Sequence, residues 1–134
     1  MGDRCYMQIT CRRQDQKRFE ELGFHLEFDE SPNSHLVELI DEEANYAHYN
    51  SLPTDIPYHG DHGAGGEYGS YDLACDGQTY AEVETGHAGE FVIDWDETTR
   101  QPTPKSLQRI RQFFVVIESA RKQLTATTSQ PTPG

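Results

Sequence analysis

The segment TPKSLQRIRQFFVVIESARKQL, residues 103–124, decides the fold class because it has the clearest periodic pattern in the chain. Thr103 is suited to be a helix N-cap, and Pro104 is suited to the first helical position. Apolar residues then recur at helical spacing, forming a stripe of Leu107, Ile110, Phe114, Ile117 and Leu124. We therefore expect one long amphipathic helix that covers a sheet.

A run of five apolar residues, Phe113–Ile117, widens this stripe near the middle of the helix. One covering layer buries only one side of a helix, so we expect a second element to contact this run. The candidates are a short first helix and a second copy of the chain. A homodimer through this run is therefore one alternative.

Shorter segments upstream of the long helix alternate apolar and polar residues, as strands do. Strands are predicted at residues 5–11, 24–28, 35–41, 72–75, 78–85 and 91–96, with a hairpin turn at Asp76-Gly77. Residues 13–22 predict a short helix that ends before Gly23, and residues 51–71 predict a long loop. We expect an α+β fold with a mainly antiparallel sheet of five or six strands, packed on one face by both helices. Residues 1–124 form one domain in this prediction, and residues 125–134 form a disordered tail.

Basic and acidic residues are distributed unevenly along the 134-residue chain, whose net charge is −12. All eleven Lys and Arg residues lie before Phe19 or after Thr99, so 81 consecutive residues contain neither. The same segment holds twenty of the twenty-three Asp and Glu residues. One alternative is an acidic surface that serves only solubility. Because an ordinary charged surface mixes both signs, this separation favours instead a surface that is kept free of cations in order to bind a basic partner.

Carboxylates on two neighbouring predicted strands could form such a surface. Alternation places two of them on one face of residues 78–85, and the strand at residues 91–96 carries others beside them, about 5 Å away. A row of negative charges at this spacing suits a Lys/Arg-lined groove that otherwise binds nucleic acid. With a second acidic cluster from residues 41–43, the candidate partner-binding residues are Glu82, Glu84, Asp94, Asp96, Glu97, Asp41, Glu42 and Glu43.

In chain size and in its acidic segment from Glu20 to Glu97, the protein resembles a class of small acidic inhibitors carried by phages and mobile elements. These are the anti-CRISPR and anti-restriction proteins that imitate nucleic acid. The resemblance implies that the target is a nucleic-acid-binding surface of a bacterial defence complex, such as a CRISPR effector or a nuclease. An immunity protein for a basic nuclease toxin would use the same electrostatics and is a related alternative.

An enzyme alternative centres on His59-Gly60-Asp61-His62, because imidazole and carboxylate groups are zinc ligands. A metal-dependent hydrolase would use His59 and His62 in this way. Two histidines three residues apart on a glycine-rich loop are a weak signal, since zinc sites normally collect three or four ligands. We therefore expect no metal, no cofactor and no enzymatic activity.

Other functional classes have little support in the sequence. It contains neither a nucleophile elbow nor a phosphate-binding Gly-x-x-x-x-Gly-Lys motif. Direct nucleic-acid binding by the basic flanks is disfavoured, because the strongly acidic body would oppose it. No apolar run approaches the length of about 20 residues that spans a bilayer, so we expect a cytoplasmic protein that does not contact membranes. Cys5, Cys11 and Cys75 match no metal or redox spacing and are expected to be free thiols.

Overall fold

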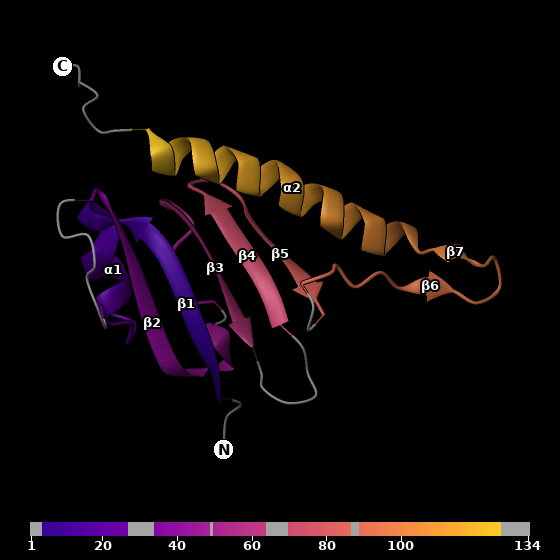
Figure 1. The fold of residues 1–134 in the computed structure, drawn as a ribbon, viewed down its shortest axis with the longest axis horizontal. Coiled ribbons are helices and arrows are strands. Elements are labelled where there is room, and N and C mark those ends of the chain that lie inside the picture. Colours follow the sequence, from indigo (N-terminus) through magenta and orange to yellow (C-terminus); the bar gives the residue numbers. More distant parts are fainter. Residues whose placement is uncertain (1–3, 27–33, 49, 64–69, 87–88, 127–134) are drawn as a thin grey trace.

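The computed structural model describes residues 4–26, 34–48, 50–63, 70–86 and 89–126, and it confirms the α+β fold class (Figure 1). A five-stranded antiparallel sheet has the strand order β2-β1-β3-β4-β5. A separate two-stranded ribbon, β6-β7, lies beyond one end of this sheet, next to the start of the long helix. The elements are β1 (Arg4–Arg12), the 3-10 turn η1 (Arg13–Asp15), α1 (Gln16–Glu20), β2 (Leu36–Asn45), the 3-10 turn η2 (Tyr46–His48), β3 (Pro57–Gly63), β4 (Ser70–Asp76), β5 (Tyr80–Thr85), β6 (Trp95–Asp96), β7 (Gln101–Pro102) and α2 (Pro104–Thr125).

The predicted long helix is α2, and it begins as the sequence indicates. The Thr103 hydroxyl accepts a hydrogen bond from the Ser106 N–H, and Pro104 is the first helical residue. The helix packs on β3, β4 and β5. Within the predicted apolar run, Phe113 and Val116 face the sheet, whereas Phe114 and Val115 are 46 % and 63 % exposed. The homodimer through this run stays a prediction, and residues 127–134 of the expected tail lie outside the described residues.

The two helices lie on opposite faces of the sheet, so the prediction that both pack on one face is wrong. Phe113 of α2 packs in a cluster with Ala74 of β4, whereas Phe19 of α1 packs in a cluster with Leu73 and Cys75. Successive residues of a strand point to opposite faces, and therefore these two clusters occupy opposite sides of β4. Both faces of the sheet thus contribute a hydrophobic core.

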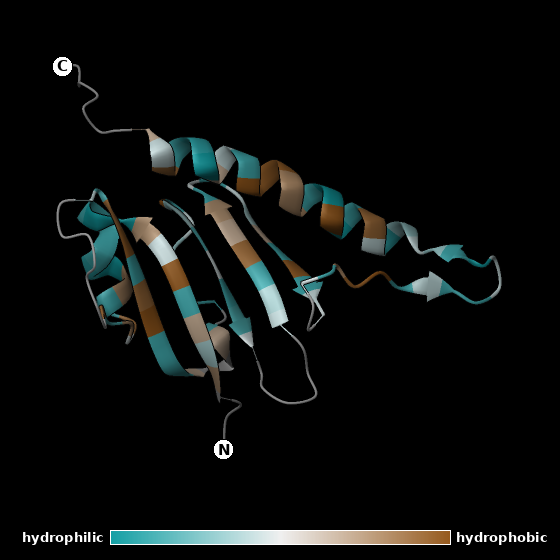
Figure 2. Ribbon diagram, in the orientation of Figure 1, coloured by the Kyte–Doolittle hydropathy of each residue, from teal (hydrophilic) through white to brown (hydrophobic). Residues whose placement is uncertain are grey.

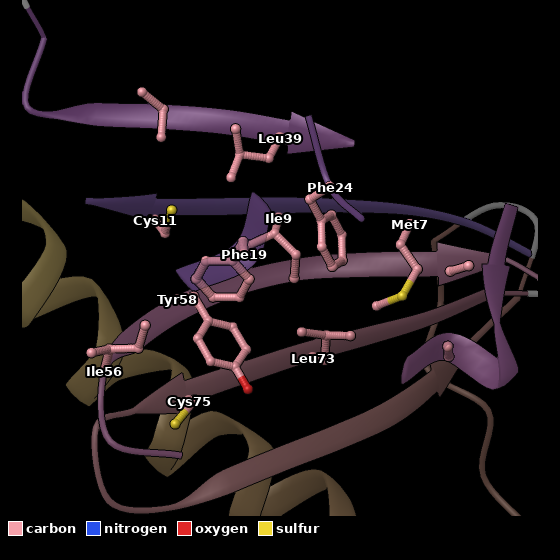
Figure 3. Packing of buried hydrophobic residues seen from close by; sticks show 13 residues of the cluster. Met7, Ile9, Cys11, Phe19, Phe24, Leu39, Ile56, Tyr58, Leu73 and Cys75 are labelled. Carbon is pink, nitrogen blue, oxygen red and sulfur yellow. The ribbon is translucent and has the colours of Figure 1, made fainter. Parts of the chain in front are cut away.

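The α1 side holds the larger core, which Figure 3 shows in close view. Phe19 makes edge-to-face contacts with Phe24 and Tyr58, at ring-centroid distances of 5.8 and 5.1 Å. Gly23 ends the preceding turn with φ +116°, and its N–H donates to the Glu20 carbonyl, as the predicted glycine cap requires. The short helix therefore places one large aromatic side chain over the centre of the sheet.

The predicted long loop at residues 51–71 contains a central strand, β3, so that prediction is wrong. Proline and glycine within 57–63 masked the strand pattern, but β3 pairs with β1 along residues 58–63 and with β4 along residues 57–63. Gly60 is required there by close packing: a Cβ atom would lie 1.9 Å from the Gln8 carbonyl oxygen of β1. The glycine that suggested a loop thus marks tight strand contact. Residues 64–69 lie outside the described residues.

Other predicted strands are partly confirmed. The predicted strand at 35–41 is present as β2, which continues to Asn45. Of the predicted strand at 24–28, the described residues show a single bridge between His25 and Ile40. Residues 27–33 lie outside the described part. The hairpin around Asp76-Gly77 is present, with Gly77 at φ +95°. Residues 91–96 do not form a sheet strand beside β5, because only Phe91 forms a bridge there before the chain leaves the sheet for β6.

In the described part of the chain, no helix is both long enough and apolar enough to cross a membrane. Cys5, Cys11 and Cys75 are free thiols, as predicted.

Candidate functional site: an acidic groove on the open half of the sheet

A groove of about 550 Å³ lies on the α2 face of the sheet. It exists because α2 packs over β3, β4 and β5, so that β1 and β2 on this face are left without a covering helix. Strands β1, β2, β3 and β4 form its floor and α2 forms one wall. We call it the acidic groove, and its lining includes Gln8, Thr10, Glu38, His59, Asp61, Asp72, Phe91, Phe113, Phe114, Ile117, Glu118 and Arg121.

Strand register places the polar floor residues in two adjacent rows. One row crosses from Glu38 through Thr10 to His59. The second row crosses from Gln8 through Asp61 to Asp72. Asp61 and Asp72 are direct partners on neighbouring strands, so their side chains lie on the same face with Cβ atoms about 5 Å apart. Two like charges therefore stand side by side in the floor.

The wall formed by α2 and the chain after β5 is aromatic. Phe91 and Phe114 meet edge to face at a centroid distance of 5.2 Å, and Phe113 lies behind them. Ile117 continues this wall along α2. The groove thus combines a charged floor with an apolar side, which suits the alkyl stem and charged head of a lysine or arginine side chain.

Partial burial disfavours ionisation of the floor carboxylates. Desolvation raises the pKa of Asp61, and the neighbouring charge of Asp72 raises it further. Desolvation also raises the pKa of Asp72, against a smaller lowering by His59. Within the described structure, neither Asp61 nor Asp72 forms an ion pair with a lysine or arginine. A positive charge entering the groove would favour the ionised form of both.

Two basic residues also line the groove. Desolvation lowers the pKa of His59, and the nearby Arg121 lowers it further, so that His59 is held neutral at neutral pH. Arg121 is charged, but it shares the groove with the carboxylates of Glu38, Asp61, Asp72 and Glu118. If all four are ionised, the groove carries a net charge of −3. It remains acidic despite the arginine from the basic C-terminal flank.

The N-terminal basic flank also contacts the acidic segment, away from the groove. Arg18 forms an ion pair with Asp55 at 2.8 Å, and both side chains are exposed to solvent. Arg12 instead pairs with Asp15 of its own flank, also at 2.8 Å. The flanks therefore neutralise part of the acidic segment, but these contacts leave the groove floor open.

The predicted row of carboxylates does not form as expected. Glu82 and Glu84 do share a face with Tyr80, on the side opposite α2, as their alternation with Ala81 and Val83 indicates. Glu84 is exposed. Glu82 is not: its side chain is 9 % exposed and bonds to His62 at 2.7 Å, with the Tyr80 hydroxyl at 3.3 Å. We therefore correct the expectation that Glu82 stands outward.

Asp94, Asp96 and Glu97 lie on the extension that contains β6, and not on a strand beside Glu82 and Glu84. Asp94 and Glu97 are exposed there, while one Asp96 carboxylate oxygen accepts from the Thr98 and Thr99 N–H groups at 2.8 and 3.1 Å. The sequence pattern was misleading because alternating apolar residues also occur in an extended segment that leaves a sheet.

The second predicted cluster lies at the far end of β2. Asp41 is partly buried and bonds to His48 at 2.7 Å, and its other oxygen accepts from the Glu43 N–H. Glu42 is exposed and lies 3.2 Å from His25. The lining of the acidic groove includes none of residues 41–43. Two of these carboxylates have histidine partners instead.

The geometry contradicts a joint zinc site at His59 and His62. Both belong to β3, three residues apart, and so they point to opposite faces of the sheet. His59 lines the acidic groove, whereas His62 bonds to Glu82 and stacks on Tyr71 on the other side. Among the residues that the structure describes, no group of three or more His, Cys, Asp and Glu side chains is placed to hold a metal ion.

Sequence reasoning missed the floor of the groove. Asp61 lies in a segment that the sequence predicts to be a loop, where only the zinc alternative includes it. Asp72 and Glu38 lie in predicted strands, but the pattern marks neither as a site residue. A signal was present: Tyr58, Gly60 and His62 alternate with His59 and Asp61, which would have indicated a strand with one polar face.

No known protein family, curated protein or solved structure matches this chain. We therefore infer function from the chemistry of the groove and from the charge distribution.

Proposed function

We propose that this protein is an acidic inhibitor that binds a Lys/Arg-rich nucleic-acid-binding protein and blocks its access to nucleic acid. The acidic groove is the contact surface. Lysine or arginine side chains of the partner enter it, with their charged heads on the floor carboxylates and their stems against the aromatic wall. The partner class is a basic nucleic-acid-binding protein such as a CRISPR effector or a nuclease, and no cofactor or catalysis takes part.

One observation carries the proposal: Asp61 and Asp72 are direct cross-strand neighbours in an open groove. Like charges in this arrangement weaken a sheet, and both carboxyl groups have a raised pKa because they are partly desolvated. Polar residues without charge would make a more stable floor. A cation bound between the two carboxylates offsets their repulsion, so the arrangement is suited to a basic ligand.

Competition with nucleic acid follows from the same charges. Lys and Arg residues of a groove that binds DNA or RNA neutralise phosphates, and the cations condensed on the nucleic acid are then released. Carboxylates of the groove and of the exposed acidic segment can pair with the same Lys and Arg residues in place of the phosphates, and salt screens this attraction. Binding should therefore weaken as salt is raised, as nucleic-acid binding does.

The test starts from a nuclease-treated lysate of the source cells, passed over the immobilised protein and eluted with a salt gradient. We expect capture of a protein that binds nucleic acid when tested alone and loses that binding when the inhibitor is added in equal amount. Asp61→Lys with Asp72→Lys should abolish capture, since it reverses the charge of the groove floor.

The matched control is Glu20→Lys with Glu21→Lys, which makes the same change in net charge at two exposed residues near α1. This control should retain capture if the groove is the contact surface. If both double variants lose capture equally, total charge rather than the groove determines binding. If the captured protein still binds nucleic acid when saturated with this chain, the proposed inhibition is wrong.

A further inference from the structure

The chain between β5 and α2 forms an extension that presents apolar side chains to solvent. Val92, Ile93 and Trp95 are 39 %, 37 % and 61 % exposed. Figure 2 shows this hydrophobic stretch leading into β6, which lies beyond the end of the five-stranded sheet. We call residues 92–102 the tryptophan arm. Trp95 is the only tryptophan of the chain.

Hydrogen bonds hold the arm in one conformation before any partner is present. Trp95 and Asp96 of β6 pair with Pro102 and Gln101 of β7, and the Arg100 N–H donates to the Asp96 carbonyl at 2.8 Å. The base is joined to the start of α2, because the Asp94 N–H donates to the Ser106 hydroxyl at 3.1 Å and the Thr103 N–H donates to the Asp94 carbonyl at 2.8 Å. A preformed arm loses little conformational entropy on binding.

Acidic groups accompany the exposed apolar ones. Asp94, Asp96 and Glu97 belong to the arm, against the single cation Arg100. A hollow of about 500 Å³ is bounded by Trp95, Asp96, Glu97 and Arg100, so the tryptophan, two acidic residues and one arginine border the same space. An exposed indole beside carboxylates suits an arginine or lysine that is held next to apolar residues, because the ring attracts the cation and the acids neutralise it.

We propose that the tryptophan arm is a second docking element, which inserts Trp95 and the Val92–Ile93 strip into an apolar recess bordered by arginine or lysine on the partner. This inference rests on the proposed function, since it concerns the same basic partner. A second copy of the chain is a poor occupant, because both molecules carry a net charge of −12. The arm and the acidic groove thus recognise different features of the partner. The groove binds positive charge, and the arm binds positive charge next to apolar surface.

Two synthetic peptides of equal length and equal positive charge test this proposal, one alternating Arg with Leu and the other alternating Arg with Ser. Both should bind the full-length protein through its carboxylates. Only the Arg/Leu peptide should shift the emission of Trp95 to shorter wavelength and protect it from iodide and acrylamide quenching, since only that peptide buries the indole. Because the chain has one tryptophan, the signal reports on the arm alone.

Substitutions in the arm separate its role from that of the groove. Trp95→Ala and Ile93→Ser should each weaken binding of the Arg/Leu peptide by about tenfold or more, measured by calorimetry, and leave the Arg/Ser peptide within about twofold. The matched control is Val115→Ser, which removes an apolar side chain that is 63 % exposed on α2 and should change neither affinity. Asp61→Asn with Asp72→Asn should weaken the binding of both peptides. The emission shift of Trp95 at saturating Arg/Leu peptide should persist in this variant.

The outcomes distinguish the two proposals. If both peptides bind without changing Trp95 emission, and the arm variants bind as the unsubstituted protein does, the arm inference is wrong while the groove proposal stands. If neither peptide binds at low salt, the proposed function itself fails. A third outcome is that the Arg/Leu peptide binds more tightly than the Arg/Ser peptide, but Val115→Ser weakens binding of the Arg/Leu peptide as much as Ile93→Ser does. Apolar contact outside the arm would then explain the tighter binding, and the arm inference would be overturned.

Discussion

Replacing Asp61 by asparagine should stabilise the folded protein at neutral pH. Asparagine keeps nearly the same shape but removes one of two charges that face each other across β3 and β4. At about 5 Å, two unit charges repel by about 0.8 kcal/mol in water and by about 3 kcal/mol at an effective dielectric constant of 20. Asp61 is only partly desolvated and remains accessible to solvent, so screening reduces the gain to roughly 0.5 kcal/mol. That corresponds to an increase of about 1–3 °C in melting temperature.

The sign of the pH dependence follows from the raised pKa of Asp61. The folded protein binds this proton more tightly than the unfolded chain does, so the unsubstituted protein loses stability as pH rises from the ordinary carboxyl pKa of 3.8 through the folded value. Above that interval the charge is present and unfavourable. The advantage of Asp61→Asn should therefore be largest at pH 7 and vanish in acid.

Urea unfolding at pH 7 and pH 4, followed by circular dichroism, measures this difference. Glu97→Gln is the control, because it neutralises an exposed carboxylate outside the groove and should change the free energy of unfolding by less than about 0.3 kcal/mol. If Asp61→Asn destabilises the protein at pH 7, the carboxylate stabilises the native state, and our reasoning about a repulsive groove floor is refuted.

Three further predictions concern the sheet and its core. Gly60→Ala should destabilise the protein by at least about 2 kcal/mol in urea unfolding, because its Cβ would lie 1.9 Å from the Gln8 carbonyl oxygen; a neutral result would contradict the close packing of β1 and β3. Phe19→Ala should lower the free energy of unfolding by about 3–5 kcal/mol in the same measurement, since it removes the aromatic ring at the centre of the α1 core. A decrease below about 1 kcal/mol would be inconsistent with that packing. Burial raises the pKa of Cys11 to about 12, so mass spectrometry should find it unmodified by iodoacetamide at pH 8 until urea unfolds the chain; rapid labelling of the native protein would count against its burial.

Local rules were sufficient to predict the long helix, the Gly23 cap and the Asp76-Gly77 hairpin. Each depends on neighbouring residues: Thr103 and Pro104 begin α2 whatever lies beyond it, and Gly23 and Gly77 adopt positive φ values that other residues avoid. The strands β1 and β5 were likewise evident from alternation over six or more residues.

The features that the sequence pattern does not predict depend on contacts between residues far apart in the chain. Pro57 and Gly60 indicated a loop, yet β3 is a central strand because both of its edges find partners, and Gly60 is needed where β1 comes closest. The burial of Glu82 depends on His62, which lies twenty residues away in the chain. The acidic groove could not be predicted because it depends on which strands α2 leaves uncovered.

The salt dependence of binding to the captured basic partner tests the central claim most directly. Dissociation constants would be measured at several salt concentrations for the unsubstituted protein, Asp61→Asn with Asp72→Asn, and Glu20→Gln with Glu21→Gln. We predict that the groove variant binds at least about tenfold more weakly at low salt and with a shallower slope of log Kd against log salt, while the α1-side control keeps the original slope. Identical slopes and affinities for all three proteins would contradict the claim that the acidic groove takes the place of a polynucleotide.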